Sequence, residues 1–226
     1  MISRRRKSAF GRKSTPLLSR TPHGLKTKKL VLILTESRET EPNYFEALKN
    51  EDSIKAGFKV NIKRTGDSPD KVVRRAIELK EEEELRDSEG IFTYDQVWCV
   101  LDVEGPENLK SITEAIDLAQ KNNIYLCLSN PCFEIWLLSH FVREGRYYRS
   151  AKAVEQRLNK SWRDHTGQEY DKSAPRIYDM ISGLTDQAIQ NAQWVREEHH
   201  KNRKNPLDCN SSTEVYRLVK FLLSRD

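Results

Sequence analysis

The chain has 226 residues, of which 37% are hydrophobic and 32% are charged. This length suits one medium domain or two small ones with a real core. The longest apolar run, residues 30–34, is far shorter than the ~20 residues of a membrane-spanning helix, and neither periodic glycine nor sustained heptads occur, so membrane, collagen-like and coiled-coil classes are excluded. No apolar segment follows the basic N-terminus as in a secretory signal, so we expect a cytoplasmic protein without membrane association.

The charge is unevenly distributed along the chain. Residues 1–29 hold ten basic and no acidic residues, whereas residues 30–226 carry 29 basic and 34 acidic residues. The first segment also lacks a hydrophobic period, so we predict a disordered basic arm. Such an arm either binds nucleic acid or another acidic partner, or serves only as a solubilising tail. The remainder is mildly acidic, so it must hold nucleic acid locally or use metal ions to neutralise phosphate.

Short apolar runs alternate with amphipathic segments between residues 30 and 142. The predicted strands are residues 30–34, 58–62, 97–101 and 124–128. The predicted helices are residues 42–50, 69–86, 108–121 and 132–142, the last with Asn130 as its cap and Pro131 in its first turn. This alternation is typical of a parallel sheet with helices on both faces. The four cysteines form no C-x-x-C pair and are predicted to be buried and reduced.

From residue 143 onward only helical patterns occur. The predicted helices are residues 151–158, 174–181, 185–200 and 212–223. Residues 211–214 fit a capping box for the last of these, and the alternative is that residues 210–213 line a site. We therefore predict a basic arm (1–29), an α/β domain with a central parallel sheet of about four strands (30–142), and a helical extension packed on that domain (143–226).

Acidic residues follow the predicted strands directly. Glu36 comes after the first strand, and Asp102 and Glu104 come after the third. Ligands bind beyond the carboxyl ends of the strands in open parallel sheets, and residues two apart on an extended chain project the same way. Clustered carboxylates suit Mg²⁺ or Mn²⁺. The alternative is that these acids only cap helices, which fits Glu41 better than Glu36 or Asp102.

Other polar residues near the strand ends extend this candidate site. Glu39 and Glu41 are candidates for a second ion, although Glu41 also suits a helix cap. Glu134 either joins the metal site or only interacts with the dipole at its helix start. The candidate substrate-binding residues are Arg38, Lys63, Arg64 and Asn130. No P-loop, G-x-G-x-x-G or G-x-S-x-G motif is present, which argues against the sites that these motifs mark.

Several segments resemble the RloB-like family. Residues 35–45, TESRETEPNYF, are similar to its first motif, E-G-x-x-T-E-P-x-Y-F, and residues 97–102 resemble the second, an apolar strand followed by D-x-D. Residues 129–138, SNPCFEIWLL, are very similar to the distinctive segment S-N-P-x-F-E-x-W-L-L. Residues 172–178 and 210–219 resemble its C-terminal segments, so the similarity covers about residues 30–223.

The resemblance implies a Toprim-like fold and a metal-dependent catalytic domain encoded in prokaryotic restriction and phage-defence loci, often beside an AAA- or ABC-type ATPase partner. Carried over to this sequence, the catalytic residues are Glu36, Asp102 and Glu104, which hold Mg²⁺. Two positions depart from the family pattern. Ser37 stands where the family usually has glycine, and Glu104 stands where it has the second aspartate.

These observations lead to three hypotheses. The main one is metal-dependent cleavage of phosphodiester bonds in DNA or RNA, tRNA included, during abortive-infection defence. The second is a catalytically degenerate domain that serves as a binding or regulatory module of a defence ATPase. The third is nucleotidyl transfer, because Toprim folds also support primases. The sequence leaves the oligomeric state open, a homo-oligomer included.

Overall fold

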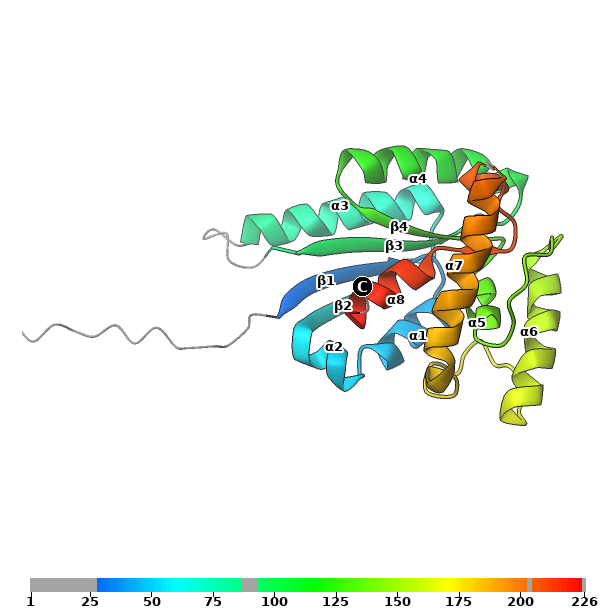
Figure 1. Cartoon of the computed structure of the whole chain (residues 1–226). Coiled ribbons are helices and arrows are strands. Elements are labelled where there is room, and N and C mark those ends of the chain that lie inside the picture. The colour runs from blue at the N-terminus through cyan, green and yellow to red at the C-terminus, as the bar shows by residue number, and fades with distance from the viewer. Residues whose placement is uncertain (1–27, 87–92, 203–204, 225–226) are drawn as a thin grey trace, which may run out of the picture.

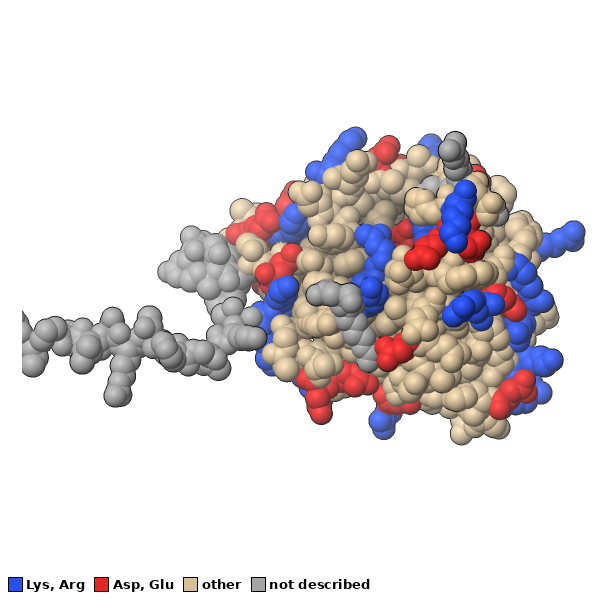
Figure 2. All heavy atoms as spheres, in the orientation of Figure 1, with Lys and Arg blue, Asp and Glu red and all other residues tan. Residues whose placement is uncertain are grey.

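The structure is a computed structural model that describes residues 28–86, 93–202 and 205–224. Most of the predicted basic arm therefore lies outside the described residues, and Lys29 already belongs to the first strand. On the face drawn in Figure 2, basic and acidic side chains are interspersed. This face thus carries no uniform basic coat, as the mildly acidic composition of residues 30–226 predicts.

A five-stranded sheet forms the centre of the molecule (Figure 1). Its strands are β1 (Lys29–Thr35), β2 (Phe58–Arg64), β3 (Gln96–Asp102), β4 (Tyr125–Asn130) and β5 (Ser212–Thr213). The spatial order is β2-β1-β3-β4-β5, with β1 to β4 parallel and β5 antiparallel to β4. The predicted α/β class and all four predicted strands are confirmed. The fifth strand was not predicted, because two residues are too short to show a period.

Helices cover both faces of the sheet (Figure 1). They are α1 (Thr40–Leu48), α2 (Asp52–Gly57), α3 (Pro69–Arg86), α4 (Leu109–Lys121), α5 (Glu134–Ser139), α6 (Ala151–Thr166), α7 (Thr185–Lys201) and α8 (Val215–Leu222). In β1, Leu32 and Leu34 pack in one cluster with α3 and α4, whereas Val31 and Ile33 pack in a second cluster with the remaining helices. Burial of both faces explains why the strand is a continuous apolar run.

The C-terminal part of the chain shares the core of the sheet. Trp162 of α6 and Val219 of α8 belong to the same buried cluster as Val100 of β3. All four cysteines are buried and none forms a disulfide, as predicted. No helix in the described ranges has the length and apolar character needed to cross a membrane.

Two predicted helices differ from the structure. The helix expected over residues 132–142 begins only at Glu134 and ends at Ser139, and the Asn130–Pro131 peptide bond is cis. The Pro131 carbonyl accepts a hydrogen bond from the Glu104 backbone N–H (2.8 Å), so this turn is tied to the loop after β3 instead of to a helix. Residues 174–181 form turns instead, with the Asp179 N–H donating to the Arg176 carbonyl and the Ile181 N–H to the Tyr178 carbonyl. Pro175 removes a helical donor and disfavours a helical residue before it.

The predicted capping box at residues 211–214 is also wrong. Ser212 and Thr213 form β5 and pair with Asn130 and Ser129 of β4. Glu214 precedes α8 but pairs with Arg196 (3.0 Å) and does not bond back to the helix start. Pairing with the exposed edge of β4 outweighs the local capping geometry, because the sheet satisfies more backbone groups.

Candidate active site

The candidate site lies where the direction of the strand order reverses. Strand β1 has β2 on one side and β3 on the other, so the crevice beyond the carboxyl ends of β1 and β3 is the switch point of the sheet. Glu36 follows β1, and its backbone N–H donates to the Val100 carbonyl of β3 (3.2 Å). The Glu36 Oε2 atom accepts a hydrogen bond from the Asp102 N–H (3.0 Å). The predicted pair from the first and third strands is therefore brought together.

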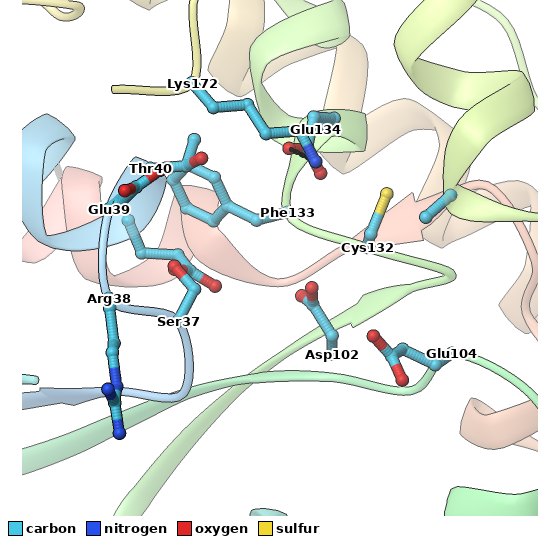
Figure 3. Close-up of a pocket in the computed structure, with 12 residues that line it drawn as sticks. Ser37, Arg38, Glu39, Thr40, Asp102, Glu104, Cys132, Phe133, Glu134 and Lys172 are labelled. Carbon is cyan, nitrogen blue, oxygen red and sulfur yellow. Dashed lines mark ion pairs between the residues drawn. The ribbon is translucent and has the colours of Figure 1, made fainter. Parts of the chain in front are cut away.

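A pocket of about 320 Å³ opens above these strand ends (Figure 3). Five carboxylates line it, from three different loops and helix starts: Glu39, Glu41, Asp102, Glu104 and Glu134. Asp102 and Glu104 lie on one side of the pocket, and Glu134 with Lys172 lies on the opposite side (Figure 3). Asp102 and Glu104, which follow the third strand, thus share one pocket with the three other acidic candidates, Glu39, Glu41 and Glu134.

Two carboxylate oxygens in this pocket are buried without a hydrogen-bond partner, Glu41 Oε2 and Asp102 Oδ1. Glu41 is only 1% exposed. Burial, reinforced by the neighbouring carboxylates, raises the pKa of Glu41 to about 8 and holds the pKa of Asp102 well above its ordinary value. Unpaired buried carboxylates oppose folding when ionised. This part of the site is therefore built to accept positive charge.

Glu36 lies beside the pocket and is not part of its lining. Burial raises the pKa of Glu36 to about 7, against the opposing hydrogen bond from the Asp102 N–H. A carboxyl group that titrates near neutrality suits general acid or base chemistry. Glu36 thus differs in position from the acids that line the pocket, while its raised pKa is a property that it shares with Glu41.

The residues of the pocket fit a hard divalent cation. Carboxylate oxygens are the preferred ligands of Mg²⁺ and Mn²⁺, and the two unpartnered oxygens lack a counter-charge. Among the described residues, no three His, Cys, Asp or Glu side chains are gathered as a ready-made ligand set. Mg²⁺ is often held by only one or two carboxylates, with waters and substrate phosphates as the other ligands. Asp102 and Glu104 satisfy that requirement.

Glu104 occupies a left-handed backbone conformation, with φ of 49°. Its N–H donates to Pro131, and its Oε2 atom accepts from Asn108 Nδ2 (2.9 Å). Such φ values are uncommon for glutamate and are often found at functional sites. Ser37, by contrast, has an ordinary negative φ. The departure from glycine at Ser37 therefore brings no backbone strain.

We expect Glu104→Gly to raise the melting temperature by about 2–4 °C, because glycine relieves roughly 1 kcal/mol of left-handed strain. Thermal unfolding without added metal measures this. Glu104→Gln keeps the Cβ atom and separates the effect of charge from that of the backbone. Glu107→Gly, at an exposed neighbouring position with ordinary φ, is expected to destabilise. An equal loss of stability in both glycine variants would show that the strain is not relieved.

Glu134 is balanced by a cation that the sequence-based prediction missed. The Glu134 Oε1 atom lies 3.5 Å from Lys172 Nζ and accepts a hydrogen bond from the Tyr170 hydroxyl (3.2 Å). Lys172 also pairs with Glu155 of α6. The only sequence signal for Lys172 was its place at the start of the family-like segment 172–178. This network accounts for the burial of Glu134 in the first turn of α5.

We expect Lys172→Met to lower the free energy of unfolding by about 1–2 kcal/mol, or the melting temperature by roughly 2–8 °C. The buried Glu134 carboxylate loses its counter-ion, although the half-exposed lysine moderates the loss. Arg163→Met is the matched control, because its pair with Glu169 is exposed on both sides and is worth at most about 1 kcal/mol. If Glu134→Gln fails to rescue Lys172→Met, the pair is not the cause.

The predicted substrate-binding residues divide into two groups. Arg38 lines the pocket rim, its side chain turned away from Glu134 (Figure 3) and packed over Gly66. Arg64, at the end of β2, donates a long hydrogen bond from Nη1 to the Arg38 carbonyl oxygen (3.5 Å). The exposed Lys63 precedes it. Asn130 is instead buried, and its Nδ2 atom donates to the Leu207 carbonyl (2.7 Å). Asn130 therefore supports the loop before β5 and lies outside the carboxylate pocket, but it lines a neighbouring hollow that shares Glu104 with that pocket.

A mostly parallel sheet with a carboxylate pocket at its switch point defines a Rossmann-like α/β protein. The chain belongs to the RloB-like protein family, whose match covers residues 31–222. This confirms the resemblance seen in the motifs. No curated protein and no solved structure matches the chain.

Proposed function

We propose that the chain is a metal-dependent nuclease that hydrolyses phosphodiester bonds of DNA or RNA through a Toprim-like arrangement of carboxylates. The observation that carries this proposal is the pair of buried, unpartnered oxygens of Asp102 and Glu41, beside Glu36 and Glu104 at the switch point. The family resemblance supports a role in prokaryotic phage defence, with an ATPase as partner and the cytoplasm as location.

Asp102 and Glu104 would hold Mg²⁺ or Mn²⁺, with Glu39 and Glu41 available for a second ion. Such an ion supplies Lewis-acid stabilisation of the charge that develops on the scissile phosphate. Glu36 takes the proton of the attacking water, or returns one to the leaving oxygen, with its carboxyl held in place by the Asp102 N–H.

Basic side chains at the rim position the strand on either side of the scissile phosphate. Arg38 and Lys172 line the pocket itself, and Lys63 and Arg64 extend the basic surface along the end of β2. Contacts of this kind to phosphate fix the register of the substrate without reading its sequence.

A second candidate function is a binding module of the ATPase partner that has lost catalysis. The observation that favours it is Glu104, which replaces the usual aspartate and sits in a strained conformation. This candidate predicts that Mg²⁺ and Mn²⁺ do not stabilise the protein, whereas a bound cation raises the melting temperature. Nucleotidyl transfer is distinguished by incorporation of a labelled nucleoside triphosphate.

The deciding experiment incubates the purified full chain with labelled tRNA, single-stranded DNA and duplex DNA in Mg²⁺, Mn²⁺ or EDTA. Each reaction is run with and without an ATPase encoded beside the gene for this chain. We expect cleavage of at least one substrate with metal and none in EDTA. Absence of cleavage in every reaction, together with no thermal shift on adding metal, would favour the binding module instead.

A further inference from the structure

Two further hollows continue from the candidate active site across Glu104. One, of about 280 Å³, shares Glu104 and Ala151 with the carboxylate pocket. The other, of about 320 Å³, shares Glu104 with it and reaches the exposed Leu109. Tyr147 therefore lines the two hollows that adjoin the carboxylate pocket at Glu104.

Tyr147 is exposed because its neighbour is anchored. The Tyr148 backbone N–H donates to Asn210 Oδ1 (2.7 Å), and its carbonyl accepts from Asn210 Nδ2 (2.8 Å). The Tyr148 ring is buried under the Arg146 guanidinium (4.7 Å), and its hydroxyl bonds to Glu144. Tyr147, held by this fixed backbone, remains 73% exposed. A large aromatic ring on an anchored loop is a ready stacking surface at low entropic cost.

The polar groups around Tyr147 are of two kinds. Arg149 is exposed and makes no ion pair with any described residue. Glu107 and Asp208 bring carboxylates to the hollows. Carboxylate oxygens repel phosphate but accept hydrogen bonds from the amino groups of bases, whereas arginine at the rim binds phosphate. The combination fits a nucleobase inside a hollow and its phosphate beside Arg149.

We propose that these hollows, here called the Tyr147 groove, bind unpaired nucleotides next to the scissile phosphate, so that the substrate is single-stranded or locally unpaired nucleic acid. This inference rests on the proposed nuclease function. A paired base is stacked on both faces and presents no free ring to a side chain, whereas a single strand stacks successive bases on aromatic residues. Charge complementarity at Arg149 and continuity with the carboxylate pocket through Glu104 support this occupant.

Fluorescence anisotropy of the full chain tests the Tyr147 groove without requiring cleavage. The probes are labelled single strands of RNA and of DNA of about 12 nucleotides, and the corresponding duplexes. Binding is measured in Mg²⁺ with Glu36→Gln, because the proposed mechanism makes cleavage by this variant about 10²- to 10⁴-fold slower. We expect tighter binding of the single strands than of the duplexes. In that background, Tyr147→Ala should weaken single-strand binding by about 5- to 100-fold, and Tyr147→Phe by at most about twofold.

Tyr125→Ala is the matched control. Tyr125 is another exposed tyrosine, and it lies at the amino-terminal end of β4, whereas the Tyr147 groove lies at the carboxyl end of that strand. We expect Tyr125→Ala to leave binding unchanged. Arg149→Ala should weaken binding. It should also make the slope of log K against log salt concentration shallower by about one, as expected for the loss of one phosphate contact. Equal binding of duplex and single strand, or full binding by a folded Tyr147→Ala variant, would overturn the inference. Cleavage of duplex substrates by the wild type would support the nuclease proposal and contradict the inference about the groove. Single-strand binding that depends on Tyr147, without cleavage in any reaction, would support the groove and contradict the nuclease proposal.

Discussion

Glu36→Gln is expected to lower metal-dependent cleavage by about 10²- to 10⁴-fold, which is the usual contribution of a general acid or base. Glutamine keeps the size of the side chain and still accepts the Asp102 N–H, so the fold is retained. The wild-type rate should change with pH through an apparent pKa of about 7, the value to which burial raises the pKa of Glu36. It rises with pH where Glu36 acts as the base and falls where Glu36 acts as the acid. The variant should lose this pH dependence. Single-turnover cleavage between pH 5.5 and 8.5 measures both effects.

Two comparisons make this prediction specific. Asp117→Asn removes an exposed acid of α4 that lies outside both the carboxylate pocket and the Tyr147 groove, and its rate should stay within about twofold of the wild type. The thermal shift on adding Mg²⁺ should persist in Glu36→Gln, because Asp102 and Glu104 hold the ion. Loss of that shift would make Glu36 a metal ligand, and wild-type turnover by a folded variant would remove it from the mechanism.

The position of the site was predictable from the sequence because burial and topology leave strong local signals. A strand covered on both faces has no polar alternation, so the first acid after residues 30–34 or 97–101 marks a strand end. Parallel strands then bring Glu36 and Asp102 to the same edge. Their hydrogen bond confirms this juxtaposition, although the role of each residue stays a proposal.

The rest of the site depends on contacts between distant segments. Lys172 lies 38 positions after Glu134, in a segment of turns, so no helix or strand spacing pairs the two. Strand β5 is defined by its pairing with β4 and has no signal of its own. Asn130 ends a strand, but its side chain donates to the carbonyl of Leu207, 77 positions further along the chain, and no local pattern predicts this contact. Such non-local choices override local propensity.

The carboxylate pocket also lowers the stability of the metal-free protein, and the buried Glu41 contributes to this cost. The carboxyl of Glu41 has a pKa of about 8 in the folded chain, against an ordinary 4.5. Because the folded state binds this proton more tightly than the unfolded state, the stabilisation that protonation provides is complete below about pH 4.5. It is lost as the pH rises through 8. The metal-free protein should therefore lose stability between pH 5 and pH 8.

Glu41→Gln is expected to remove this loss, since glutamine stays neutral and keeps the shape of the side chain. At pH 8 without metal we expect a gain of about 2–4 kcal/mol, or on the order of 5–10 °C in melting temperature. At pH 5 the gain should fall below about 1 kcal/mol. Thermal unfolding in EDTA at both pH values measures the difference.

Glu46→Gln on α1 is the matched control, because the Glu46 side chain is 39% exposed and pairs with Lys49 (2.5 Å). Its effect should stay within about 0.5 kcal/mol at either pH. Mg²⁺ should stabilise the wild type at pH 8 and narrow its gap to Glu41→Gln, because a bound cation replaces the missing counter-charge of the buried oxygens. A gain that is equal at both pH values would mean that ionisation of Glu41 is not its source. In that case the unpartnered oxygen would no longer argue for a cation in the pocket.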